Sequence, residues 1–161
     1  MPPLILSKAE LDLSTRRQRH IHNQMNREPP LYGALLQIEA IKRSLTNLIH
    51  RDDVGPCNTF NCHGLTFASR RTWIDRSEDI QKILDDDDYT EIKNKRNVKP
   101  GDIAIFRKDG EIYHSGIVVD VSDSLRGPRI LSKWAVLHEV IHYPYEGPYS
   151  DGVVTYYRVT L

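Results

Sequence analysis

The sequence predicts an α+β domain in which N-terminal helices pack on an antiparallel β-sheet. Helix-type periodicity of apolar residues is confined to the first half of the chain, and the second half carries short strand-type runs. Turns rich in Gly, Pro and Asp separate these runs. Helices followed by strands are typical of an architecture in which one face of the sheet is covered. The 161 residues suffice for one domain whose core needs no disulfides.

Composition argues against several classes of function. Lys plus Arg and Asp plus Glu both number 22, so no overall charge favours a nucleic-acid or membrane partner. Cys57 and Cys62 are too few for a disulfide scaffold, and they lack the companion pair that a zinc site needs. We therefore expect no metal and no cofactor. We interpret Cys57 as a packed or idle thiol, with redox pairing to Cys62 as the alternative.

No apolar run has the length of a signal peptide or a membrane span, and the first, Leu4–Leu6, is far too short. We expect a cytoplasmic protein as encoded, with export by a dedicated secretion system as the alternative. Residues 1–30 are predicted to form a polar N-terminal arm, with the basic run at 16–22 on a solvated surface. Residues 31–161 are predicted to form the folded domain.

Three helices are predicted before the sheet. Apolar residues spaced by three and four indicate an amphipathic helix over residues 31–50. A second helix is expected from Cys62 to about Ile74 with Asn61 as its N-cap, and a third is expected to start at Ser77. The run Asp85–Asp88 follows. Its carboxylates are not at alternate positions and no glycine marks a bend, so we interpret it as a solvated loop rather than a calcium site.

The strands follow from turn chemistry and alternation. A Pro-Gly turn at 100–101 opens one strand, and Asp109-Gly110 closes a tight hairpin that places His114 on the return strand. Further strands are expected at 129–134, 139–143 and 153–161. His138 and His142 stand near the fourth strand, but no third ligand accompanies them, so we interpret both as ordinary histidines.

Cys62 is the candidate nucleophile. The free backbone amides at the start of a helix favour thiolate over thiol. Gly64 is expected to leave the first turn bare, so that a substrate carbonyl can approach the sulfur. A cysteine enzyme also needs a base that forms an ion pair with the thiolate, and His114 is the candidate.

The order of these motifs resembles the NlpC-type papain-like cysteine peptidases and amidases. The resemblance rests on Asn61-Cys62-x-Gly64-Leu65 and on Pro100-Gly101-Asp102 through His114-x-Gly116-Ile117, about the middle two-fifths of the chain. It implies a papain-like fold and the catalytic triad of a thiol protease, with Cys62 and His114 as two members. The third polar residue of this family lies on the strand after the histidine.

Two residues compete for that third position. Counting back across the turn from His114 reaches Ser132, whereas Glu139 and His142 on the next strand are chemically better acceptors. Ser132 and Glu139 therefore stay as alternatives. The chain departs from the family at His63, where a serine is usual, and in lacking a tyrosine before the nucleophile, where Asn58 offers a polar contact. The expected substrate-binding residues are Asn58, His63 and Trp134, the last of which would offer aromatic surface.

The function predicted from these residues is cysteine-dependent amide hydrolysis through an acyl-thioester on Cys62. The resemblance makes bacterial cell-wall stem peptides the first substrate class to consider. One alternative is a non-catalytic module that binds a peptide or a protein on the same fold. Another is an acyltransferase or isopeptidase that acts on protein substrates, because hydrolysis and transfer share the same acyl-enzyme.

Overall fold

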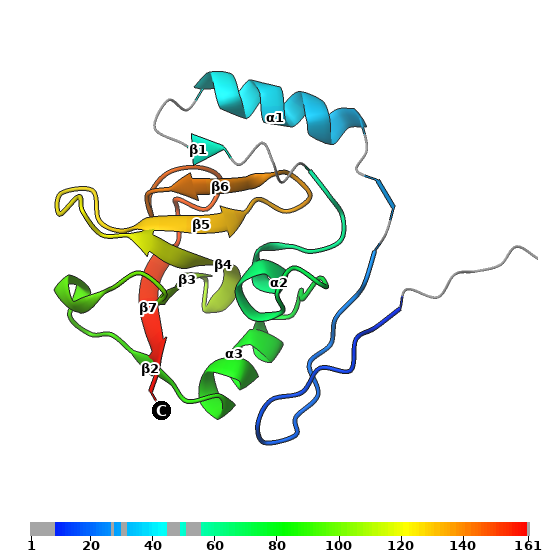
Figure 1. Ribbon diagram of the computed structural model, residues 1–161, viewed down its shortest axis with the longest axis vertical. Coiled ribbons are helices and arrows are strands. Elements are labelled where there is room, and N and C mark those ends of the chain that lie inside the picture. The colour runs from blue at the N-terminus through cyan, green and yellow to red at the C-terminus, as the bar shows by residue number, and fades with distance from the viewer. Residues whose placement is uncertain (1–8, 27, 30–31, 45–48, 51–55, 161) are drawn as a thin grey trace, which may run out of the picture.

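The computed structural model describes residues 9–26, 28–29, 32–44, 49–50 and 56–160 (Figure 1). It confirms an α+β fold with an antiparallel sheet. The helices are α1 (Tyr32–Ser44), α2 (Cys62–Phe67), α3 (Ser77–Asp86) and a short 3-10 helix (Lys95–Asn97). The strands are β1 (Ile49–His50), β2 (Tyr89–Glu91), β3 (Ile103–Lys108), β4 (Glu111–Asp120), β5 (Arg129–Lys133), β6 (Glu139–His142) and β7 (Val153–Val159).

The sheet has the order β1-β6-β5-β4-β3-β7-β2, and each neighbouring pair is antiparallel. Successive side chains of a strand point to opposite faces, so the register assigns every residue to a face. His114 lies opposite Phe106, and Ser132 lies opposite Val140. Ser115, the next residue of β4, belongs to the other face together with its partner Ile105. The sheet therefore separates the surroundings of His114 from those of Ser115.

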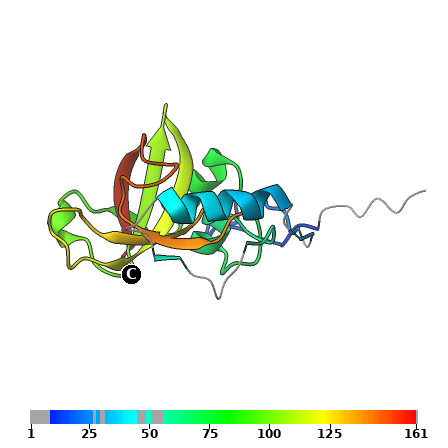
Figure 2. The same cartoon turned by 90° about the horizontal axis from the view of Figure 1, so that it is seen from above.

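Each face of the sheet is covered by different elements. On the face of Ser115, the apolar residues of α3 pack on β3, as Ile80 and Leu84 do with Ile105. The α2 helix lies beside them and packs Leu65 on β5. On the opposite face, α1 covers the β5–β6 end of the sheet through Ile38 (Figures 1 and 2). The expectation that one face alone is covered was too simple.

Both of the first two predicted helices are shorter than expected. The first ends at Ser44, and Ile49–His50 pairs with β6 instead of continuing the helix. The second ends at Phe67, because Ser69 and Arg70 have φ values of 50° and 63°. A left-handed backbone terminates a helix. Side-chain periodicity did not reveal these ends, since each segment remains partly apolar beyond them.

The predicted strands are present, and β2 is an addition that three residues without clear alternation did not signal. The third helix begins where expected, but Ser77 is not its cap. The Ser77 hydroxyl accepts a hydrogen bond from the backbone N–H of Ile112 at 2.8 Å, and Arg76 occupies the capping position. Ser77 therefore ties α3 to β4 rather than closing its own helix.

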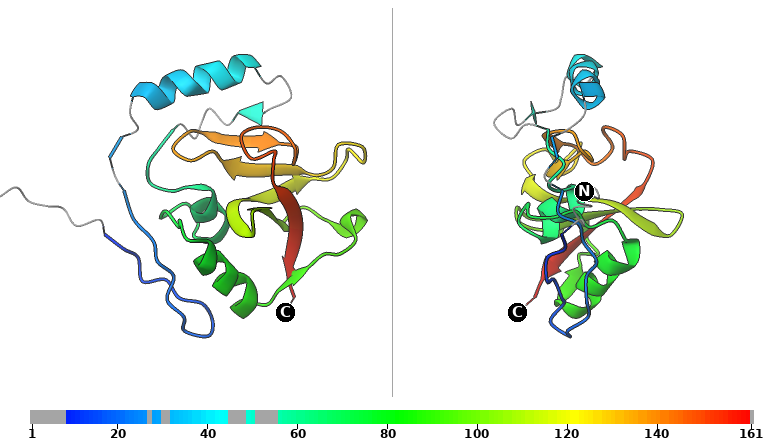
Figure 3. Two further views of the ribbon diagram at one scale, coloured as in Figure 1. Left: turned by 180° about the vertical axis from the view of Figure 1, so that it is seen from behind. Right: turned by 90° about the vertical axis from the view of Figure 1, so that its right-hand side faces the viewer.

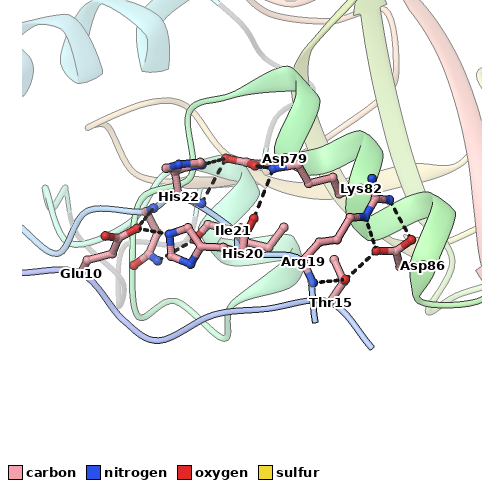
Figure 4. Close-up of polar contacts among 10 residues, drawn as sticks. Glu10, Thr15, Arg19, His20, Ile21, His22, Asp79, Lys82 and Asp86 are labelled. Atoms are coloured by element: carbon pink, nitrogen blue, oxygen red, sulfur yellow. Dashed lines mark hydrogen bonds and ion pairs between the residues drawn. The ribbon is translucent and has the colours of Figure 1, made fainter. Parts of the chain in front are cut away.

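The N-terminal segment, residues 9–26, packs along α3 (Figures 3 and 4). Ile21 is 2% exposed and joins the core beneath α3. Arg19 donates two hydrogen bonds of 2.7 Å to the Asp86 carboxylate, and the Thr15 hydroxyl adds a third at 2.6 Å. His22 Nδ1 lies 3.0 Å from Asp79.

One of the two predictions about solvated charge was therefore wrong. The arginines of the basic run are exposed as expected, with Arg17 at 75% and Arg19 at 45%, but Asp86, in the acidic run, has a fully buried side chain. Opposite charges from the two runs satisfy each other, although about 70 residues separate them in the chain, as |i−j| = 67 for Arg19 and Asp86 shows. Within the described part of the chain, no helix is long and apolar enough to cross a membrane.

Candidate active site

Cys62 is the first residue of α2, and the loop around it is clamped by Asn61. The Asn61 side-chain oxygen accepts hydrogen bonds from the backbone N–H groups of Gly64 (2.9 Å) and Ile74 (3.2 Å). Its amide nitrogen donates to the carbonyl of Ile74 at 2.7 Å. The predicted N-cap is confirmed. The same side chain also fixes the segment that returns past the start of α2.

The Cys62 sulfur lies among backbone donors, yet it is a thiol at neutral pH. Burial raises the pKa of Cys62 to about 11, against the opposing effect of backbone N–H groups of Ser115, His63 and Cys62 and of the Lys133 charge. Desolvation destabilises the thiolate more than these N–H groups and the lysine charge stabilise it. The expectation that the helix start alone would favour the thiolate therefore failed, because the residue is 5% exposed and the helix has six residues.

Gly64 does not open the nucleophile to substrate, as the sequence had suggested. A Cβ atom at this position would overlap the carbonyl oxygen of Thr72 and lie 3.0 Å from Cβ of Phe60. The space next to Gly64 is occupied by the backbone of Thr72, in the segment that returns past the start of α2. Gly64 is thus a packing requirement of the loop that holds Cys62.

His114 is fully buried on the opposite face of β4 from α2. Tyr149 stacks on its ring with centroids 3.7 Å apart and an interplanar angle of 2°, and Phe106 contacts it edge-on at 4.9 Å. Neither ring nitrogen has a hydrogen-bond partner among the described residues. Burial, followed by the neighbouring His142 and His63, holds the pKa of His114 well below its ordinary value. The ring is therefore neutral at pH 7, and the predicted ion pair with Cys62 is not formed.

The two alternatives for the third triad position lie on opposite faces of the sheet. Glu139 is opposite Lys133 in the register and forms a bidentate ion pair with Arg70, at 2.5 and 3.1 Å. Ser132 shares the face of His114 and places its hydroxyl 2.7 Å from Nε2 of His142. Neither forms the predicted hydrogen bond to His114, but Ser132 alone is on its side.

His142 controls the direction of the Ser132 hydroxyl. His142 Nδ1 lies 2.8 Å from the carbonyl oxygen of Tyr143, which can only accept, so Nδ1 carries the proton. Nε2 is then the acceptor, and the Ser132 hydroxyl donates to it. The rings of His142 and His114 lie 6.2 Å apart. This pair therefore stands beside His114 with its hydroxyl proton already engaged.

Lys133 is a further residue of the site, which the sequence analysis did not predict. It is fully buried and donates to the carbonyl oxygens of Cys57 (2.8 Å) and Ala135 (2.6 Å), with its ammonium 4.9 Å from the centre of the Phe60 ring. Burial lowers the pKa of Lys133 to about 8, and interactions with Cys57, Cys62 and Glu139 oppose that shift. Strand alternation could have revealed it, since the residue after Ser132 must face α2.

A cleft lies beside Cys62, and of the three predicted substrate-binding residues only His63 is among those that line it. Trp134 is 1% exposed and packs beneath α1, and Asn58 lines another cavity next to Val136. Aromatic and acidic residues complete the cleft. Its lining consists of Asn61, Cys62, His63, Trp73, Asp75, Ser77, Glu111, Ile112, Tyr113, Ala135 and Tyr149.

Comparison of the chain with protein-family models, with curated proteins and with solved structures finds no match. Among the described residues, no group of three His, Cys, Asp or Glu side chains could hold a metal ion, His138 and His142 included. Cys57 and Cys62 are both free thiols. The function must therefore be argued from the geometry around Cys62.

Proposed function

We propose that the protein is a cysteine-dependent amide hydrolase of the papain-like, NlpC type, with Cys62 as nucleophile and His114 as base. One observation carries the proposal. Cys62 borders a cleft, and the backbone N–H groups of Ser115, His63 and Cys62 act to lower the pKa of its thiol, one of them from the residue next to His114. Convergent backbone donors stabilise a developing anion in a buried site.

The proposed reaction begins from the neutral pair. Because His114 lies on the opposite face of β4 from α2, its ring must first move to the Cys62 sulfur. The Cys62 thiol then transfers its proton to His114, and the thiolate attacks the substrate carbonyl carbon. The tetrahedral oxyanion is stabilised by backbone N–H donors, including that of Cys62. The C–N bond then breaks, the amine leaves with the proton held by His114, and water hydrolyses the thioester. Tyr149 lines the cleft and stacks on His114, so we infer that substrate displaces Tyr149 before the proton moves.

The Ser132–His142 pair is our choice for the third member of the triad. Because the Ser132 proton is donated to His142, the lone pairs of its oxygen are directed elsewhere and can accept an N–H from His114. Such an acceptor stabilises the imidazolium that forms during catalysis. Glu139 is already neutralised by Arg70 on the other face.

A binding module is the second candidate, and the resting chemistry of the site favours it. A thiol with a pKa of about 11 and a neutral histidine without a hydrogen-bond partner among the described residues make a site that is inert as it stands. A protein that only binds peptides would need no ionised pair. An acyltransferase or isopeptidase would share the chemistry proposed for the hydrolase and differ in the group that accepts the acyl chain.

The test is incubation of the purified protein with bacterial wall fragments and with a library of peptides and isopeptides, followed by mass spectrometry. Cys62→Ala should abolish product formation, and the matched variant Cys57→Ala should retain it. Addition of a primary amine separates transfer, which gives an amide product, from hydrolysis. Cleavage that persists in Cys62→Ala would refute the proposed nucleophile. Tight binding of one peptide without turnover by either protein would favour the binding module.

A further inference from the structure

A hydrogen-bonded relay on the face of α2 fixes the protonation of His63. The Thr66 hydroxyl donates to the carbonyl oxygen of Cys62 at 2.9 Å, so its proton is engaged there. The Ser115 hydroxyl, 3.0 Å from the Thr66 oxygen, must therefore donate to it. His63 Nδ1 lies 2.7 Å from the Ser115 oxygen, and with the serine proton already engaged, Nδ1 is the donor. His63 is thus the Nδ1–H tautomer.

This tautomer leaves Nε2 as an acceptor in the cleft. His63 lines the cleft beside Cys62, and among the described residues its ring hydrogen-bonds through Nδ1 alone. Burial lowers the pKa of His63 to about 4, so the ring is neutral at pH 7 and Nε2 keeps its lone pair. The relay also holds the ring in place, because Ser115 is fully buried in β4.

The other residues that line the cleft also favour a ligand that donates hydrogen bonds. Its charged side chains are Asp75 and Glu111, both acceptors, and no lysine or arginine is among the lining residues. A cleft with these acceptors matches a ligand that presents N–H donors next to the group attacked by Cys62.

We propose that His63 is a specificity-determining residue that accepts a hydrogen bond from a substrate N–H beside the carbonyl attacked by Cys62. This role rests on the proposed function. Substrates with an unsubstituted N–H at that point are selected over those in which the nitrogen is fully alkylated. A buried acceptor left unpaired by the wrong substrate disfavours it more than the bond itself favours the right one.

The test uses two alkylating probes and needs no amide turnover. Iodoacetamide carries N–H donors, and 2-iodo-N,N-dimethylacetamide does not. Cys57 is the internal reference in the same protein. We expect the ratio of Cys62 to Cys57 labelling to be about three- to tenfold higher with iodoacetamide, the contribution of one hydrogen bond. His63→Phe and Ser115→Ala should abolish that preference, and His63→Gln, which keeps an acceptor, should restore part of it.

Several outcomes would overturn the assignment. They are equal ratios for the two probes, a preference that survives in Ser115→Ala, or no labelling of Cys62 by either probe. Nitrogen-15 spectra of the histidine rings check the relay without any variant, because an Nε2–H pattern for His63 contradicts it. A preserved probe preference without cleavage of any amide would reject the hydrolase and retain the role of His63.

Discussion

The hydroxyl groups of Thr66, Ser115 and Ser132 each donate to one acceptor, and these bonds determine which ring nitrogens of His63 and His142 carry a proton. Thr66 donates to the carbonyl of Cys62, which makes His63 a donor through Nδ1. The carbonyl of Tyr143 takes the Nδ1 proton of His142, which makes Ser132 the donor to Nε2. His114 has no such partner among the described residues. Within that part of the chain, neither of its ring nitrogens is committed to a hydrogen bond, whereas His63 and His142 are each held through Nδ1, so both nitrogens of His114 are available for the proposed proton transfer.

Gly64 provides a prediction at the scale of one residue. Gly64→Ala places a methyl group against the carbonyl oxygen of Thr72, and the backbone must shift to relieve the overlap. We expect the free energy of unfolding to fall by about 3 kcal/mol or more. The matched variant is Gly33→Ala in α1, where an added Cβ meets nothing within 4 Å. It should stabilise the protein by about 0.5 kcal/mol, because alanine favours helix. Urea unfolding measures both, and similar values would contradict the packing described for Gly64.

Sequence patterns predicted the positions of the site residues better than their protonation states. Asn61 as a cap and the hairpin that carries His114 were predictable, because both depend on local residue types. The raised pKa of Cys62 was not, since burial determines it and burial depends on β4 and β5. Strand alternation predicts the face on which Lys133 lies, but only the completed sheet places its ammonium beside the loop of Cys57.

At the scale of elements, the N-terminal segment supports the loop that holds the nucleophile. Gln24 pairs with Trp73 through backbone hydrogen bonds of 2.9 Å, and the Asn23 side chain accepts a hydrogen bond from the Thr72 hydroxyl at 2.8 Å. Asn61 binds the same segment from the other side through Ile74. The sequence could not predict this arrangement, because the matching charges of the segment and of α3 lie far apart in the chain and each run resembles a solvated surface on its own.

Asp86 tests whether this packing stabilises the protein. Asp86→Asn removes the charge that Arg19 and Thr15 bind in a buried position (Figure 4). The pKa of Asp86 is lowered to about 2, first by its hydrogen bonds to Arg19 and Thr15. Its stabilisation is therefore present above the unfolded pKa of about 3.9 and lost as pH falls toward 2. At pH 7 we expect Asp86→Asn to lower the thermal unfolding midpoint.

Asp85→Asn is the matched control for this prediction. Asp85 precedes Asp86 in α3, is exposed, and accepts a hydrogen bond from Gln81 that asparagine can also accept. Its substitution should change the free energy of unfolding by less than about 0.5 kcal/mol. Circular dichroism at pH 7 gives both midpoints. Equal midpoints for the two variants would mean that the N-terminal segment contributes nothing through Asp86.

At the scale of the whole molecule, burial keeps His63, His114 and His142 neutral, and this couples folding to pH. Burial is the largest cause of the lowered pKa of His63, His114 and His142. When a histidine has a lower pKa in the folded protein than in the unfolded chain, the unfolded chain binds more protons below pH 6.5. Stability is therefore retained above pH 6.5 and lost as pH falls. Each ring that stays neutral contributes about 1.4 kcal/mol per pH unit.

His114→Phe isolates one part of this dependence. Phenylalanine keeps an aromatic ring between Tyr149 and Phe106 and removes two nitrogens that have no hydrogen-bond partner in the part of the chain that the structure describes. The larger ring changes packing by an amount independent of pH, so the slope of stability against pH is the informative quantity. Between pH 6.5 and 5.0 we expect the variant to lose about 1 kcal/mol per pH unit less than the wild type, because the unfolded histidine is only half protonated at pH 6.5. Urea unfolding at several pH values measures both slopes. Parallel slopes would show that His114 is protonated as readily in the folded protein as in the unfolded chain, which would contradict the lowered pKa of the buried ring.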